Sequence, residues 1–286
     1  MQTVDKVGII SKPGVSRTAE LLQGAVAWLK ERNVTVRFDD VTAAYLGRSD
    51  GVPRESVPDG SQLIIVLGGD GTLLSAARAI AGRDIPLFAV NLGGLGFLTA
   101  ITVEELYPEL ERAFRGEHRI GLRRMLNCEL WRGENRVDQY EALNDVVLTK
   151  ASLARMIELD AHVDSHFVCA YKADGLIIST PTGSTAYSLS AGGPIVFPTV
   201  EALCITPICP HMLTNRPVIL PDESVIRIVS RSDGDAYLTI DGQVGVSLEA
   251  NDQIVCRLSD KTLRLVRPPH LRFFDVLREK LSWGER

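Results

Sequence analysis

The sequence predicts an α/β first domain with a mostly parallel, Rossmann-like sheet, followed by a β-rich second domain. In the first third of the chain, short apolar segments alternate with segments of helical spacing, which is typical of parallel strands covered on both faces. From about residue 123, strand-like segments follow one another with turn residues between them and almost no helical pattern. At 286 residues, the chain is long enough for two domains.

The first domain is expected to span residues 1–121, and the tail 268–286 is expected to return to it. Residues 45–60 form a polar connection that contains Gly and Pro. Two glycine-rich loops follow the third and fourth strands, and ligands of parallel sheets bind beyond the carboxyl ends of the strands. The expected strands lie at 6–10, 34–38, 63–67 and 86–90, and the expected helices at 18–32, 73–81 and 103–115.

The second domain is expected to span residues 122–267, with a last helix at 273–281 that packs back on the first domain. Turn residues separate its strands, as in antiparallel β proteins. The strands are expected at 125–131, 141–149, 155–163, 167–171, 175–179, 224–230, 236–240, 252–258 and 263–267.

Composition narrows the possible partners. The formal net charge is −5 and no stretch carries a dense Lys/Arg run, which argues against nucleic acid or an anionic membrane as the main partner. No uninterrupted apolar segment of ~20 residues is present and residues 1–12 do not resemble a signal peptide, so a cytoplasmic protein is expected. Cys204 and Cys209 lack a second Cys/His pair at zinc-like spacing, so buried thiols are expected rather than metal ligands at all five cysteines: Cys128, Cys169, Cys204, Cys209 and Cys256.

The run Gly68-Gly69-Asp70-Gly71-Thr72 follows an apolar strand and precedes a helix. Glycines let backbone N–H groups approach a ligand, and such a turn at a helix start suits phosphate oxygens. The run lacks the Lys-Ser/Thr of a Walker loop and the spacing of the dinucleotide fingerprint. It differs from both because it contains a carboxylate where phosphates would bind. The alternative is that Asp70 only caps the helix.

A carboxylate next to phosphates is useful when a hydroxyl must be oriented and lose its proton during phosphoryl transfer. In a loose transition state the proton leaves late, so positioning supplies most of the rate and a weak base suffices. Asp70 is therefore the candidate catalytic residue. Arg78, two helical turns along, could reach a phosphate or form a surface ion pair, and both interpretations stay open.

Three further stretches suggest binding loops, although each could also be an ordinary turn. Residues 91–97 contain three glycines at a strand end, which require special backbone angles or a close ligand. Residues 174–194 combine hydroxyl side chains, small residues and one tyrosine, which suits a ribose, an amide and the face of a base. Asn144-Asp145 is a polar pair between apolar segments that could hold ribose hydroxyls.

Together these stretches resemble the NAD kinase family between residues 63 and about 267. The glycine-aspartate run alone is shared with lipid kinases and, in related form, with 6-phosphofructokinases. More specific are Asn-Leu-Gly-Gly-Leu-Gly-Phe-Leu-Thr at 91–99, the run 174–195 with its Ser-Thr-Pro-Thr-Gly-Ser-Thr-Ala-Tyr, and Ile-Thr-Pro-Ile-Cys-Pro-His at 205–211 followed by Arg216-Pro217.

The resemblance implies transfer of the γ-phosphate of ATP to the 2′-hydroxyl of the adenosine ribose of NAD, with Asp70 as proton acceptor. It places Asp70-Gly71 against NAD, Asn144 and Asp145 on ribose hydroxyls, Asp174 on a base, and Tyr187 against a ring. The other residues that it implies at the NAD site are Arg78, Arg155, Lys172, Thr185, Ala186, Ser188, Leu189, Ser190 and Gln243.

The family also implies Mg²⁺ bound with the ATP phosphates, with no direct protein ligand to the metal, and a homo-oligomer, dimer or tetramer. One departure is Asp145, because the pair is more often Asn-Glu in the family and the shorter side chain moves the carboxylate back. Residues 47–61 have no clear family match. Two alternatives remain open: a lipid- or sugar-hydroxyl kinase of the same superfamily, and a non-catalytic dinucleotide sensor, against which Asp70 argues.

Overall fold

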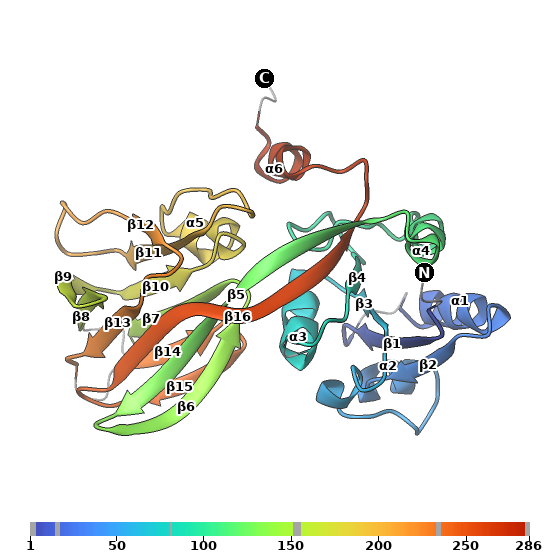
Figure 1. The fold of residues 1–286 in the computed structure, drawn as a ribbon, viewed down its shortest axis with the longest axis horizontal. Helices are drawn as coiled ribbons and strands as arrows, with labels where there is room; N and C mark the ends of the chain where they lie inside the picture. Colours follow the sequence, from blue (N-terminus) through green and yellow to red (C-terminus); the bar gives the residue numbers. More distant parts are fainter. Residues whose placement is uncertain (1–3, 15–17, 81, 151–155, 233–235, 284–286) are drawn as a thin grey trace. The chain divides into compact units, whose positions relative to one another are not determined.

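The computed structural model describes all residues except 1–3, 15–17, 81, 151–155, 233–235 and 284–286. The chain forms two compact units. The first unit comprises Met1–Leu122 and Leu263–Arg286, and the second comprises Arg123–Thr262. The predicted order, an α/β part followed by a β-rich part and a final helix, is confirmed (Figure 1). The chain enters the first unit again at residue 263 rather than 268, because the end of the last strand pairs there.

The first unit is built on a parallel sheet with the strand order β2-β1-β3-β4, and the end of β16 pairs with β4 in parallel at Leu265↔Leu87. Every residue of β3 and β4 is buried, as expected for strands covered on both faces. The carboxyl ends of β1, β3 and β4 therefore lie side by side at one edge. The strands are β1 (Lys6–Ser11), β2 (Thr35–Phe38), β3 (Leu63–Leu67) and β4 (Leu87–Val90).

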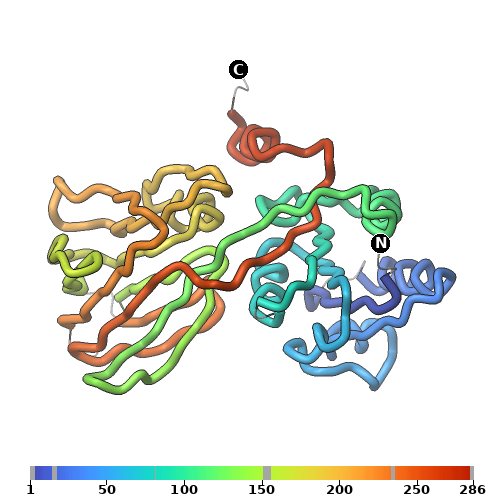
Figure 2. The backbone as a smooth tube through the Cα atoms, viewed as in Figure 1, coloured from blue at the N-terminus to red at the C-terminus, as the bar shows by residue number. Residues whose placement is uncertain are grey.

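Helices follow these strands, and Figure 2 traces the path in blue to cyan. One core cluster joins Ile9 and Ile65 of the sheet to Leu22 of α1 and Leu110 of α4. The predicted helix at 73–81 begins earlier, at Asp70, and a short helix, α2, occupies a segment where none was predicted. The helices are α1 (Thr18–Glu31), α2 (Asp40–Tyr45), α3 (Asp70–Ile80), α4 (Leu106–Arg115) and α6 (Phe273–Leu281), with the 3₁₀ turn η1 (Arg54–Ser56).

The second unit packs two mostly antiparallel sheets against each other. One has the order β16-β13-β8-β9 with β5 and β6 attached through β16, and the other has the order β12-β11-β10-β7-β14-β15. Its core draws on both sheets, for example Leu130 and Ile254 from the first and Leu148 and Ile178 from the second. β5 (Arg119–Arg132) and β16 (Gln253–Arg267) are long strands that begin or end in the first unit.

The remaining elements include several that the sequence did not predict. The predicted strand at 141–149 is two strands, β6 and β7, and the predicted strands at 252–258 and 263–267 are one continuous strand, β16. β11, β12 and β15 had no predicted counterpart. The elements are β6 (Asn135–Ala142), β7 (Asp145–Lys150), β8 (Ile157–Val163), β9 (His166–Ala173), β10 (Gly175–Ser179), η2 (Gly183–Thr185), α5 (Tyr187–Ser190), β11 (Ala202–Ile208), β12 (Val218–Pro221), β13 (Ile226–Ser230), β14 (Ala236–Ile240) and β15 (Val244–Leu248).

The expectation of buried cysteines holds for Cys128, Cys204 and Cys256, which are buried in strands. It is wrong for Cys209, which is exposed, and incomplete for Cys169, which is half-buried. Cys209 adopts a positive φ of 44° just after β11 ends, so its side chain leaves the strand core.

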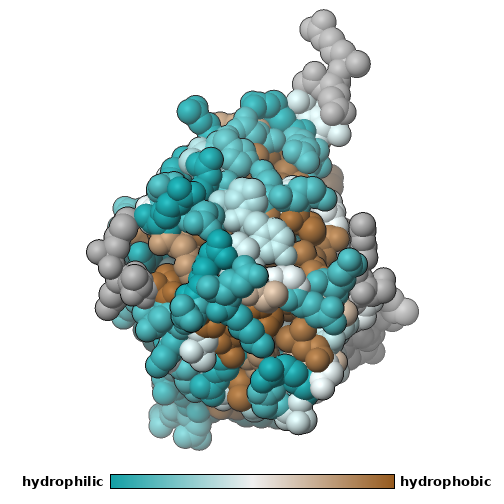
Figure 3. All heavy atoms as spheres, turned by 90° about the vertical axis from the view of Figure 1, so that its right-hand side faces the viewer, coloured by the Kyte–Doolittle hydropathy of each residue, from teal (hydrophilic) through white to brown (hydrophobic). Residues whose placement is uncertain are grey.

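None of the described helices is long and apolar enough to cross a membrane. On the face drawn in Figure 3, hydrophilic side chains predominate and hydrophobic ones occur in small groups between them.

Candidate active site

The first glycine loop is a short turn between β3 and α3. Gly68 continues the parallel ladder, because its N–H donates to the Val90 carbonyl at 3.0 Å. The Gly69 carbonyl then accepts the N–H groups of Thr72 at 3.0 Å and Leu73 at 3.2 Å, which starts the helix. Asp70 is thus the first residue of α3, where the partial positive charge of a helix N-terminus favours a carboxylate.

The Asp70 carboxylate points to the second glycine loop, from which it accepts four hydrogen bonds within the described part of the chain. Its Oδ2 accepts the Phe97 N–H at 3.0 Å. Its Oδ1 accepts the N–H groups of Leu98 at 3.2 Å and Thr99 at 3.0 Å, and the Thr99 hydroxyl at 2.8 Å. Asp70 is therefore more than a helix cap, because it ties the loop after β3 to the loop after β4.

The second glycine loop is shaped to receive this carboxylate. A Cβ atom on Gly96 would lie 2.2 Å from Asp70 Oδ1 and 2.2 Å from Thr99 Oγ1, so only glycine allows this approach. The Asn91 amide donates to the Thr99 hydroxyl at 2.7 Å, and the Arg267 guanidinium donates to the Leu98 carbonyl at 3.2 Å. Asn91, Thr99 and Arg267 are all at least nine-tenths buried, so the loop is held from its interior side.

The two carboxylate oxygens of Asp70 differ in what they can still accept. A carboxylate offers about four lone-pair sites, two on each oxygen. Oδ1 already accepts three hydrogen bonds, whereas Oδ2 accepts one. An incoming hydroxyl group would therefore donate to Oδ2. Arg78 lies partly buried on α3, two turns beyond Asp70, and Gly71 is exposed at the start of the helix.

In the second unit, Asp241 organises the polar pair that precedes β7. Its carboxylate accepts the backbone N–H groups of Leu143, Asn144 and Asp145 at distances of 2.9, 2.8 and 3.1 Å. The turn that holds Asp241 has positive φ angles at Asp241 and Gly242, and it follows the end of β14. The position of Asn144 and Asp145 is thus fixed through their backbone, and their side chains remain available for other contacts.

Asn144 presents a buried acceptor without a partner. The Thr180 N–H donates to the Asn144 carbonyl at 2.9 Å, and a Cβ on Gly183 would lie 2.0 Å from that carbonyl oxygen, so glycine is required here as well. The side-chain Oδ1 of Asn144 is buried and accepts no hydrogen bond from the described part of the chain. A buried acceptor of this kind costs about 1–3 kcal/mol unless a donor reaches it, which is what a ligand hydroxyl can provide.

Asp145 lies beside a second carboxylate in a buried position. Burial, and after it the negative charge of Asp241, raise the pKa of Asp145 to about 7. A buried Asp with a pKa in this range changes protonation state near neutral pH, which is typical of binding and catalytic positions.

The hydroxyl-rich run, residues 174–194, contains both buried and solvent-exposed side chains. Ser184 and Ser188 are fully buried; the Ser184 hydroxyl bonds to the Pro181 carbonyl at 2.7 Å, and the Ser188 hydroxyl pairs with that of Thr206 at 2.9 Å. Tyr187 is 44% exposed. Of the residues predicted to line a nucleotide site, Ser188 thus faces the interior as a framework residue, whereas the exposed or half-buried ones are Thr185, Ala186, Tyr187, Leu189 and Ser190.

The other predicted site residues occupy different surroundings. Asp174 forms an ion pair with Lys150, whose Nζ lies 2.7 Å from Asp174 Oδ1. Lys172 pairs with Glu158 at 3.0 Å on the exposed face of β8 and β9. Gln243 is exposed in the turn between β14 and β15. Arg155 lies outside the described residues.

Comparisons with known proteins cover the whole chain. Residues 7–118 match the family model described as the ATP-NAD kinase N-terminal domain, and residues 143–268 match the ATP-NAD kinase C-terminal domain. A protein named NAD kinase from Solibacter usitatus is 62% identical over 100% of both chains, and one from Trichlorobacter lovleyi is 49% identical over 98% of this chain and 99% of its own.

The chain belongs to the ATP-NAD kinase family.

Solved structures of the same family agree with this assignment. A yeast NADH kinase crystallised with NADH has a TM-score of 0.92 and 29% identity, covering 100% of this chain and 90% of its own. An NAD kinase from Archaeoglobus fulgidus in complex with ATP has a TM-score of 0.80 and 25% identity, covering 98% of this chain and 100% of its own. The alternatives of a lipid or sugar kinase and of a non-catalytic sensor receive no support from these comparisons.

Several residues of this NAD kinase family member could not be found from sequence patterns. Thr99 and Arg267 hold the loop that binds Asp70, Asp241 holds Asn144 and Asp145, and Lys150 pairs with Asp174. Each is far in sequence from the group it contacts. The only signal in the sequence was that Thr99 ends the second glycine run and that Asp241 directly precedes Gly242.

Proposed function

We propose that this enzyme transfers the γ-phosphate of ATP to the 2′-hydroxyl of the adenosine ribose of NAD, and that Asp70 accepts the hydroxyl proton. The observation that carries this role is the asymmetry of the carboxylate: Oδ1 is saturated by the second glycine loop, and Oδ2 keeps a free lone pair. The attacking hydroxyl donates to Oδ2 and becomes oriented toward the γ-phosphate. It passes its proton to Asp70 as the new O–P bond forms and the bond between the γ-phosphorus and the bridging oxygen breaks, which releases ADP.

Recognition of NAD is proposed to rest on the second unit. The unpartnered Oδ1 of Asn144 is suited to a ribose hydroxyl donor, and Asp145 provides a second acceptor once it is ionised. Tyr187 offers an exposed ring for stacking on a base. Asp174, neutralised by Lys150, can accept from an amino or carboxamide group. Asp241 supports recognition through the backbone that it holds.

Magnesium is proposed to reach the site on the phosphates of ATP. The described residues contain no group of three or more His, Cys, Asp or Glu side chains placed to hold a metal ion. The backbone N–H groups at the glycine loop suit phosphate oxygens rather than a cation, so the chain fits a metal carried by the nucleotide. When bound, the metal neutralises charge on the transferred phosphoryl group. Chelation by excess EDTA is expected to abolish turnover.

We further propose a homo-oligomer that works in the cytoplasm, where ATP and NAD are available. The exposed hydrophobic residues Phe167 (60%) and Val168 (42%) lie on β9, the last strand of its sheet, and support association through this edge. Fractionation of source cells tests the location, and light scattering tests the assembly.

The central test combines a turnover assay with a binding measurement. Purified protein is incubated with ATP, Mg²⁺ and NAD, and NADP is detected with an NADP-specific dehydrogenase. Asp70→Asn is expected to lower kcat by about 10²–10⁴-fold, as expected for the loss of a general base, while calorimetry still detects NAD binding.

Two further variants distinguish proton acceptance by Asp70 from a purely structural role of this residue. Thr99→Val removes one donor to Oδ1 and leaves the carboxylate in place, so it should lower kcat far less than Asp70→Asn. Asp260→Asn, an exposed Asp in the second unit, should leave all parameters unchanged. Equal losses of NAD affinity and turnover in Asp70→Asn would show that Asp70 is structural. Absence of NADP formation by the wild type would refute the reaction itself.

A further inference from the structure

Lys12 is placed next to the first glycine loop by the register of the parallel sheet. Ser11, the last residue of β1, is opposite Leu67, the last residue of β3. Lys12 and Gly68 are the residues that follow, and the Lys12 N–H donates to the Leu67 carbonyl at 2.8 Å. Neighbouring strands lie about 4.8 Å apart. The backbone of Lys12 therefore borders the turn that leads to Asp70.

The backbone around Lys12 is held by contacts on several sides. The Tyr45 hydroxyl donates to the Lys12 carbonyl at 3.1 Å, and the Arg54 guanidinium donates to the Ser11 carbonyl at 3.3 Å. The Ser11 hydroxyl pairs with that of Thr42 at 2.8 Å. Pro13 follows directly and restricts Lys12 to an extended backbone.

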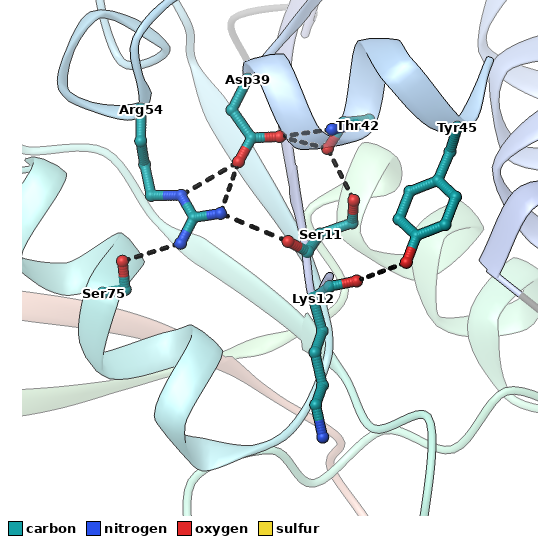
Figure 4. A network of polar contacts seen from close by, with 7 residues as sticks. All are labelled: Ser11, Lys12, Asp39, Thr42, Tyr45, Arg54 and Ser75. Atoms are coloured by element: carbon teal, nitrogen blue, oxygen red, sulfur yellow. Dashed lines mark hydrogen bonds and ion pairs between the residues drawn. The ribbon is translucent and has the colours of Figure 1, made fainter. Parts of the chain in front are cut away.

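These contacts belong to one polar network (Figure 4). Asp39, 1% exposed, receives two hydrogen bonds from Arg54, at 3.0 Å from Nε and 2.6 Å from Nη2, and accepts the Thr42 N–H at 2.9 Å. Arg54 also donates to the Ser75 hydroxyl of α3 at 2.9 Å. The network thus links α2, η1 and α3 to the end of β1. It gives a structural role to the segment 47–61, whose sequence shows no clear family motif but which lies within the matched residues 7–118.

The Lys12 ammonium takes no part in this network. Figure 4 shows its side chain extending away from the other six residues. Lys12 is exposed, and within the described ranges no carboxylate pairs with its Nζ, in contrast to Lys150 and Lys172. The backbone of Lys12 is thus held by hydrogen bonds, while its exposed ammonium has no carboxylate partner among the described residues. It lies at the edge of the sheet where phosphates are proposed to bind. In a chain of net charge −5, such local cations must supply the attraction for phosphate.

Building on the proposed function, we propose that Lys12 binds the triphosphate of the ATP donor. A lysine ammonium is a point charge that can follow a phosphate group as it moves, and stabilises the charge on its oxygens during transfer. Lys12 and Asp70 follow the adjacent strands β1 and β3 of the first unit. At this edge Lys12 binds the donor, and Asp70 binds the acceptor hydroxyl.

The test compares Lys12→Met, Lys12→Arg and Lys6→Met. Lys6 is the exposed first residue of the same strand, at its amino end, so it is a matched control for loss of one surface cation. Loss of a charge-assisted hydrogen bond corresponds to about 10- to 100-fold in affinity. Lys12→Met is expected to raise the KM for ATP by about that factor and to leave the KM for NAD within about twofold. Lys12→Arg should recover most of the ATP affinity.

Calorimetry with AMP-PNP, a non-hydrolysable ATP analogue, measures binding without turnover. Its affinity should fall in Lys12→Met and remain unchanged in Lys6→Met, and the difference should shrink at high salt. Unchanged AMP-PNP affinity in Lys12→Met would overturn the proposal, and so would an equal loss of NAD affinity, which would assign Lys12 to the NAD diphosphate. If the wild type bound AMP-PNP through Lys12 but made no NADP, the proposed reaction would be refuted, whereas the proposed role of Lys12 in binding the triphosphate would be supported.

Discussion

At the level of single residues, carboxylates serve the two units in different ways. Asp70 and Asp241 both accept several backbone N–H groups from another segment, and each thereby fixes a loop. For Asp145, burial and after it the negative charge of the neighbouring Asp241 raise the pKa to about 7. The charge of Asp145, a residue that is proposed to bind NAD, therefore changes near neutral pH.

The raised pKa of Asp145 predicts a pH-dependent stability. Because the folded state holds this proton more tightly than the unfolded state, the contribution is fully present below about pH 4 and is lost as the pH rises through about 7. The shift corresponds to a loss on the order of a few kcal/mol. Chemical denaturation of wild type and Asp145→Asn between pH 5 and pH 8 measures this difference.

The Asp145→Asn variant should lack that part of the pH slope and become the more stable protein above pH 7. Asp260→Asn, which changes an exposed carboxyl, should follow the wild type throughout. Parallel curves for wild type and Asp145→Asn would show that Asp145 does not titrate in this range.

At the level of elements, the sequence predicted the bounds of strands best where burial is complete or alternates regularly along the strand. β3, β10 and β14 begin and end where the hydrophobic pattern indicated, because their side chains are wholly or alternately buried. Most of β6 was missed because five of its eight residues are exposed and its sequence is mostly polar. β16 was divided in two because Ser259, Asp260 and Lys261 resemble a turn, although the strand continues through them with Ser259 buried and Asp260 and Lys261 exposed.

The candidate site was predictable only where it is local. Both glycine loops and the Asn144-Asp145 pair stand out along the chain, because each concentrates unusual residues in a few positions. The groups that hold them, among them Thr99, Asp241 and Arg267, act across sequence separations of 29 to 169 residues. Spacing rules for helices and strands carry no information about such contacts.

The Arg54 network predicts a stability defect. Arg54→Met would leave the Asp39 carboxylate buried without its cation, which costs about 3–5 kcal/mol in unfolding free energy. Urea denaturation measures this loss. The double variant Arg54→Met with Asp39→Asn should recover part of it, because no buried charge remains and the α2 cap is retained.

The exposed pair Arg48–Asp50 lies in the same segment and provides the control. Arg48→Met is expected to leave stability close to that of the wild type, because exposed ion pairs contribute little. Equal effects of Arg48→Met and Arg54→Met would show that the buried network does not stabilise the first unit.

At the level of the whole molecule, the proposed association through β9 can be tested directly. Phe167→Ser removes an exposed aromatic side chain from the edge strand and is expected to shift the protein toward smaller species at micromolar concentration. Size-exclusion chromatography with light scattering measures the mass. Val137→Ser, a comparable change at a 48% exposed valine of β6, is the control. A wild-type protein that is monomeric throughout would contradict the oligomer.

The two long strands β5 and β16 carry the chain out of the first unit and back into it. The second unit is consequently continuous in sequence, from Arg123 to Thr262, whereas the first needs Leu263–Arg286 to be complete. During synthesis on a ribosome, the second unit has all of its chain available before the first does. The helix with Asp70 is translated early, but the unit that holds it is completed last, when Arg267 arrives to bind the Leu98 carbonyl.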